Sequence, residues 1–263
     1  MKKSIMALLV LGLVVLVIVG CQTAQQTTQA AKILDDSSAL NYSQLGVDLS
    51  QGVTKSMVSM AQNGDVTSGI MVLGVKSDSI RSQADIPPDA NGYYHLVTNE
   101  VNASLTYGAD MHVKLVKDAQ GHVIDIYLYG TISMITSITT NPLNLVMTYG
   151  NGTNPQAAGF LPYHGTTTWA SNNLTAISAN GPMSMRTVNQ INQVTTTTSL
   201  TFNFTNYASP ITAGPDYPLG SLTLNFSVND KVSNYDITIA YNSTSVATMS
   251  YGDFTANLPL RGI

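Results

Sequence analysis

Residues 110–129, DMHVKLVKDAQGHVIDIYLY, decide the fold class. Two runs in which apolar and polar residues alternate flank the tetrapeptide at 118–121, which ends in Gly121. A period of two is typical of a β-strand with one buried face, and a four-residue connection with a final glycine is typical of a hairpin. The stretch therefore predicts two antiparallel strands joined by a short turn.

The position of the turn predicts which residues of the two strands lie opposite each other. With the turn at 118–121, one face of the hairpin is wholly apolar and the other carries a matched pair of charges. A shift by one residue would move the apolar side chains to the opposite face. The expected pairs are Leu115–Ile124, Val113–Ile126 and Met111–Leu128 on the apolar face, and Lys114–Asp125, His112–Tyr127 and Val116–Val123 on the other.

Similar runs continue to the end of the chain. Residues 221–241 predict a second hairpin, with Leu222, Leu224, Phe226 and Val228 on one face. Together these patterns predict a mainly β fold, an antiparallel meander that forms a curved sheet, a barrel or a sandwich, with one or two short helices near the N-terminus. Further strands are expected near 94–99, 101–107, 131–139, 143–149, 173–178, 195–205, 219–228, 234–241 and 245–251.

One helix is expected before the strands. Between Leu49 and Ala61 the apolar residues recur at helical spacing. Asp48 or Ser50 can cap the start of this helix, and Gly64 can end it. Residues 41–263 are expected to form a single β-rich domain.

Composition excludes several classes of protein. The 263 residues include 11 Lys and Arg, 15 Asp and Glu, and one cysteine. A mildly acidic chain without a basic run offers no electrostatic site for nucleic acid, so no nucleic-acid partner is expected. A single cysteine excludes an internal disulfide and Cys-based zinc or iron–sulfur centres. Between Asp125 and Asp216 the only charged residue is Arg186, so Thr, Asn, Ser and Gly must solubilise that part of the chain.

The first residues have the pattern of an export signal. A basic start at Lys2 and Lys3 precedes the apolar, uncharged run 5–19, which is short for a permanent membrane span. The run ends at Gly20 and Cys21. Two other interpretations are a transmembrane anchor in which the cysteine is a coincidence and a plain signal cleaved elsewhere. The complete order of basic, apolar, small and cysteine residues favours a third.

Residues 16–21, LVIVGC, resemble the lipobox of bacterial lipoproteins, and the resemblance covers residues 1–22 alone. It implies that residues 1–20 are a signal peptide and that Cys21 is lipidated with fatty acids such as palmitate. Two or more acyl chains anchor a protein stably in a membrane, whereas a single acyl chain binds only marginally. Residues 21–40 are then the lipidated cysteine and a flexible tether. The expected location is the bacterial cell envelope, with the outer membrane favoured by Gln22 in a Gram-negative host.

No constellation of residues predicts catalysis or a cofactor. Glu100 is the only glutamate, and neither a nucleophile elbow nor a phosphate-binding glycine loop is present. The expected hairpin places His112 and His122 near opposite ends, about 16 Å apart at roughly 3.3 Å per residue, too far to share a metal ion. We therefore expect no enzyme, no cofactor and no metal site.

The stretch 151–172 is the best candidate for a long loop. It contains Phe160, Tyr163, His164 and the only tryptophan, Trp169. One interpretation is a binding loop, because function concentrates on loops. The other, which we favour, is that its aromatic residues pack the loop onto the sheet.

Two functions fit these features. The first is a membrane-anchored, extracytoplasmic, non-catalytic module that is structural or binds an envelope protein. The second is a carrier of an apolar ligand such as a lipid in the concavity of a curved sheet, with adaptable methionines lining the pocket. A lipid found with the purified protein would favour the carrier.

Overall fold

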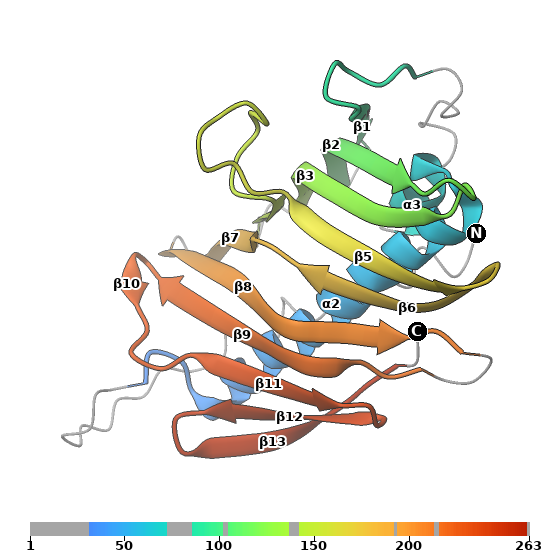
Figure 1. The fold of residues 1–263 in the computed structure, drawn as a ribbon. Helices are drawn as coiled ribbons and strands as arrows, with labels where there is room; N and C mark the ends of the chain where they lie inside the picture. The colour runs from blue at the N-terminus through green and yellow to red at the C-terminus, as the bar shows by residue number, and fades with distance from the viewer. Residues whose placement is uncertain are drawn as a thin grey trace.

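The computed structural model describes residues 32–72, 86–101, 105–136, 142–191, 194–212 and 216–261. Cys21 and the expected signal peptide lie outside these ranges. The described part is mainly antiparallel β, as the sequence predicts, with a curved sheet of thirteen strands and two helices. Figure 1 shows helix α2 running behind the sheet, so the sheet has an inner face toward α2 and an outer face away from it.

The elements follow one another along the chain as helices first and strands afterwards. They are α2 (Asp36–Asn63), α3 (Val66–Val72), β1 (Tyr94–Val101), β2 (Leu105–Lys117), β3 (Val123–Thr136), β4 (Leu143–Tyr149), β5 (Tyr163–Ala170), β6 (Asn173–Asn180), β7 (Met183–Ile191), β8 (Val194–Pro210), β9 (Leu219–Val228), β10 (Lys231–Val232), β11 (Ile237–Asn242), β12 (Val246–Tyr251) and β13 (Phe254–Pro259).

Helix α2 is longer than the sequence predicts. Its N-cap is Asp35, whose carboxylate accepts a hydrogen bond from the Ser38 amide at 2.6 Å. Its C-cap is Gly64 with φ 63°, as expected. The expected start near Leu49 is wrong, and residues 36–40, assigned to the tether, are helical. Among the described residues, no helix is long and apolar enough to span a membrane.

The hairpin of β2 and β3 exists, but its register differs from the expected one by two residues. Asp118 accepts hydrogen bonds from the amides of Gln120 and His122, which widens the turn by one residue. A bulge beside Val116 and Lys117 takes up a second residue. The observed partners are Leu115–Ile126, Val113–Leu128, Met111–Gly130, Lys114–Tyr127, His112–Tyr129, Val116–Asp125 and Lys117–Val123.

This double shift leaves the buried face unchanged, because two shifts of one residue restore the alternation. Val113 and Leu128 are fully buried on the inner face. The expected cross-strand pair of Lys114 and Asp125 does not form; Asp125 contacts His164 on β5 instead.

Two separate sets of strands connect β3 to β8 within the sheet. The N-terminal half of β3, 125–128, pairs with β5, and residues 130–135 pair with β4. On the other side, β8 pairs with β6 through 208–210 and with β7 through 194–202. Two strand pairs, β5–β6 and β4–β7, thus both lie between β3 and β8, one pair beyond the other along the direction of the strands. The connection 150–162 leaves the sheet where the two pairs meet.

Strand β5 corrects the expectation of a loop over 151–172. Residues 163–170 pair with β3 and β6, so the loop proper is 150–162. Strands β7 and β13 also lie where no strand was expected. The hairpin predicted within 221–241 is confirmed: Leu222 lies opposite Ile239, and Leu222, Leu224 and Phe226 are buried.

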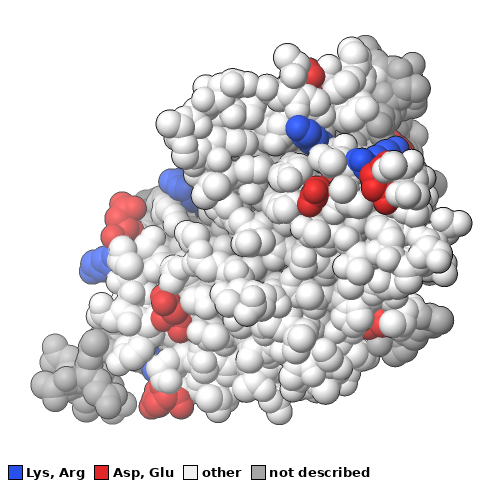
Figure 2. Space-filling view, viewed as in Figure 1, with Lys and Arg blue, Asp and Glu red and all other residues white. Residues whose placement is uncertain are grey.

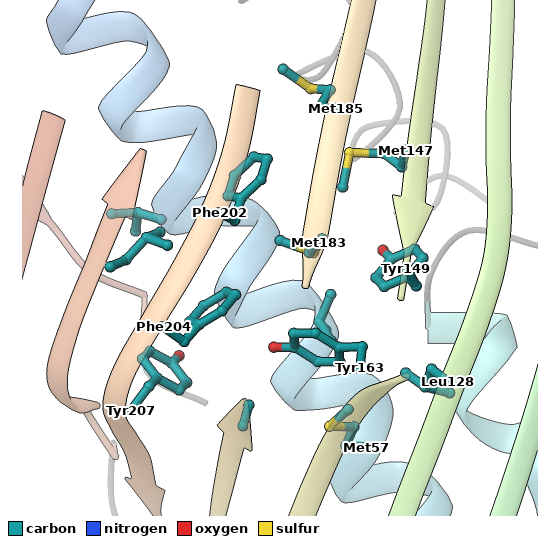
Figure 3. Close-up of a cluster of buried hydrophobic side chains, with 14 of the residues drawn as sticks. Met57, Leu128, Met147, Tyr149, Tyr163, Met183, Met185, Phe202, Phe204 and Tyr207 are labelled. Carbon is teal, nitrogen blue, oxygen red and sulfur yellow. The ribbon is translucent and has the colours of Figure 1, made fainter. Parts of the chain in front are cut away.

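The core lies between α2 and the inner face of the sheet. Figure 3 shows Met57 of α2 beside Leu128 and Tyr163 from the sheet. Tyr163 also lies edge-on to Tyr149 and Phe204, with centroids 6.1 and 5.6 Å apart. Hydroxyl pairs cross the same interface. They join Tyr42 to Thr198, Ser50 to Tyr241 and Thr54 to Tyr207.

Candidate functional site

Three aromatic rings form a row across the outer face of β1, β2 and β3. His95 lies opposite His112, and His112 lies opposite Tyr129, so their side chains project from the same face. The His95 and His112 rings are stacked at 4.2 Å and 6°, and the His112 and Tyr129 rings at 4.4 Å and 4°. The register of β1 with β2 is therefore what brings the two imidazoles together.

Asp110 completes this cluster, which we call the His–Asp–His cluster: His95, Asp110 and His112. Asp110 Oδ1 lies 2.7 Å from His95 Nε2 and 3.9 Å from His112 Nε2. One ligand atom from each of the three residues can be chosen so that all lie within 4.8 Å of one another. The side chains of His95 and Asp110 are 49% and 63% exposed, so the cluster opens to solvent.

Tyr129 forms the base of the cluster. Its ring contacts Tyr93 and Phe160 edge-on, at centroid distances of 4.9 and 5.2 Å. Burial raises the pKa of Tyr129 to about 12. Burial, and then the nearby His95, also lower the pKa of His112, which favours its neutral imidazole. This packing holds His112 in place while His95 remains at the surface.

The other two histidines each pair with one carboxylate and one aromatic ring. His164 Nε2 lies 2.8 Å from Asp125 Oδ1, and its ring stacks on Tyr127 at 4.4 Å. His122 Nδ1 lies 3.2 Å from Asp118 Oδ2. Each of these pairs contains a single imidazole, whereas the His–Asp–His cluster contains two.

The four residues of the candidate binding loop do not form one loop tip. Phe160 lies in the loop and packs against Tyr129. Tyr163 lies on β5 and is fully buried in the core. His164 lies on the outer face of β5, while Trp169 stacks on His122 at 4.7 Å and donates from Nε1 to the Val123 carbonyl at 2.8 Å. Phe160 thus packs the loop onto the sheet, and Trp169 packs against His122 from strand β5 rather than from a loop.

The pairing of His95 with His112 was not predicted from the sequence. The sequence suggested only His112 and His122 as a possible pair, and the structure keeps those two residues in separate clusters. The missing signal was the pairing of β1 with β2, since that register alone places His95 beside His112. Among the described residues, the His–Asp–His cluster is the one group of three or more His, Cys, Asp or Glu side chains close enough to hold a metal ion.

Comparison with known proteins adds no relative. No protein-family model, no curated protein and no solved structure matches this chain.

Proposed function

We propose that this protein is a lipid-anchored, extracytoplasmic module of the bacterial envelope that binds an envelope protein through the outer face of its sheet and has no catalytic role. The lipobox-like residues 16–21 and the acceptor Cys21 support the anchor. A non-catalytic role agrees with the absence of a recognised catalytic constellation in the sequence.

The single observation that carries the binding role is the position of α2. A carrier of the kind considered above keeps the concave side of its sheet for the ligand. Here α2 lies on that side and packs closely against the sheet: a Cβ at Gly46 would lie 3.2 Å from Leu224, and Met57 is fully buried. The methionines that a carrier would use to line a pocket serve as core, as Met111 and Met183 illustrate. This packing favours the binding module over the carrier.

The outer face, in contrast, offers side chains to a partner. Val97 and Leu161 are more than half exposed, and Ile135 is also exposed. Val97 lies two residues along β1 from His95, and Leu161 follows Phe160 in the loop. Figure 2 shows that this face carries few charged groups. Aromatic and apolar residues with little charge are typical of the centre of a protein interface.

Labelling with tagged palmitate tests the anchor. The wild-type protein should take up the label and partition with membranes, and Cys21→Ser should do neither. Label in the serine variant, or none in the wild type, would overturn the anchor.

Photocrosslinking in intact cells tests the binding face. A crosslinking residue at Val97 or Leu161 should give a discrete adduct with one envelope protein. The control position is Asn257 on β13, an exposed residue at the opposite end of the sheet. Equal adducts at all three positions, or none at 97 and 161, would reject this face as the interface. Native mass spectrometry that finds a bound lipid would instead favour the carrier.

A further inference from the structure

We propose that His95, Asp110 and His112 bind one divalent transition-metal ion, with zinc as the ion that the site suits best. The inference goes beyond the proposed function, because it depends on neither the lipid anchor nor a protein partner. The site lies on the same outer face of the sheet.

The donor atoms favour zinc over the alkaline-earth ions. Two imidazole nitrogens and one carboxylate oxygen are a donor set found in zinc sites, whereas Mg²⁺ and Ca²⁺ are bound mainly by oxygen. Asp110 would also offset part of the charge of the ion.

The distances are close to those that zinc requires. Two ligand atoms at about 2.0–2.1 Å from a tetrahedral zinc lie roughly 3.3 Å apart. Asp110 Oδ1 lies 2.7 Å from His95 Nε2 and 3.9 Å from His112 Nε2, one value below this separation and one above it. Shifts of roughly 0.6 Å in side-chain atoms would therefore bring both carboxylate–imidazole distances to the separation in a zinc site.

The imidazole rings must also change their relative orientation. In the stacked pair the ring planes are only 6° apart and the ring centroids 4.2 Å apart, so the lone pairs of the two rings lie in separate, nearly parallel planes and do not converge on one point. His112 is fixed by its stacking on Tyr129, whereas His95 is half exposed on β1. We expect His95 to tilt out of the stack when the ion binds and to exchange its hydrogen bond with Asp110 for a bond to the metal.

The hydrogen bonding of His112 limits the affinity. A metal-bound histidine usually donates its other ring N–H to an acceptor, and loss of such a partner costs about 10–100-fold in affinity. Nδ1 of His112 is buried and has no hydrogen-bond partner among the described residues. We therefore expect micromolar rather than nanomolar binding. Three protein ligands leave the fourth position of a tetrahedral ion to water or to a side chain of a partner.

Calorimetry with zinc chloride tests the site. The full chain, purified in detergent without a histidine tag and stripped with a chelator, should bind one ion. His95→Gln and Asp110→Asn should each weaken binding by at least about tenfold. Both side chains are exposed, so these variants should keep the circular dichroism spectrum of the wild type. His164→Gln and Asp125→Asn are matched controls from the same face, and they should bind zinc as the wild type does.

NMR of the histidine rings gives a second readout. Zinc should shift the ring signals of His95 and His112 and leave those of His122 and His164 unchanged. No binding by the wild type, unchanged binding by the His95 and Asp110 variants, or an equal loss in the controls would overturn the metal site. In each of those cases, crosslinking from Val97 would still test the proposed function separately.

Discussion

Met57 on α2 and Gly165 on β5 fit together with no room for another atom. A Cβ at position 165 would lie 2.5 Å from Met57 Sδ, and Met57 is fully buried. The helix can approach the sheet this closely because β5 presents no side chain at the point of contact.

Gly165→Ala should therefore lower the free energy of unfolding by about 1–3 kcal/mol, the usual cost of an added methyl group in a packed core. Gly52→Ala is the matched control within α2, because a Cβ there would meet nothing within 4 Å. That change should stabilise the protein by about 1 kcal/mol through helix propensity. Urea unfolding measures both. Equal effects of the two changes would contradict the close contact at Gly165.

The buried hydroxyls of Tyr42 and Thr198 should be energetically coupled. They form a hydrogen bond of 3.2 Å between α2 and β8. Thr198→Val should leave the tyrosine hydroxyl without this partner and cost about 1–3 kcal/mol. The double variant Thr198→Val with Tyr42→Phe should be more stable than the sum of the single changes predicts. Strict additivity in urea unfolding would show that the two residues do not interact.

The protein should lose stability in alkali from about pH 10 upward. Burial raises the pKa of Tyr149, Tyr163 and Tyr241 well above the ordinary value, and that of Tyr129 to about 12. Because a raised folded-state pKa means that the unfolded chain releases these protons first, stability is complete below pH 10 and falls as the pH rises.

Absorbance at 295 nm should show this as two phases. The half-buried tyrosines should ionise first and reversibly, and the fully buried ones only together with loss of the near-UV circular dichroism signal. Ionisation of all tyrosines near pH 10 with the fold intact would contradict the burial of these phenols.

The fluorescence of the only tryptophan should report on the end of the β2–β3 hairpin. Trp169 stacks on His122, and His122→Ala should expose the indole to water and move its emission to longer wavelengths. His164→Ala is the control, because His164 stacks on Tyr127 instead. Unchanged emission in His122→Ala, or an equal shift in the control, would contradict the stacking.

Elements in which apolar and polar residues recur with a clear period were predictable from the sequence. Elements whose buried face holds small or polar residues were not. The two hairpins were predicted because their apolar residues recur with a clear period. Gly64, which ends α2, was predicted because it follows a run of apolar residues at helical spacing. Strand β5 was missed because its inner face holds Tyr163, Gly165 and Thr167, where the close approach of α2 requires a glycine. Alternation is weak in such a strand, and its sequence resembles a loop.

The start of α2 and the candidate site were missed for related reasons. The buried face of the first turns of α2 includes Ser43, whose hydroxyl donates to the Ala39 carbonyl four residues earlier, and Gly46, so hydrophobic spacing does not mark it. The register of β2 and β3 depends on side-chain hydrogen bonds from the turn and on a bulge, which alternation does not reveal. The His–Asp–His cluster depends on the pairing of β1 with β2, a relation between strands that no single stretch contains.

The docking of α2 has a consequence for the order of folding. Helix α2 and the residues just before it contact the C-terminal part of the described chain: Gln51 Nε2 donates to the Arg261 carbonyl at 2.6 Å, and the Leu34 amide donates to the Tyr251 hydroxyl at 3.3 Å. The inner face therefore cannot close around α2 until β13 and Arg261 have been synthesised, and such long-range closure slows folding.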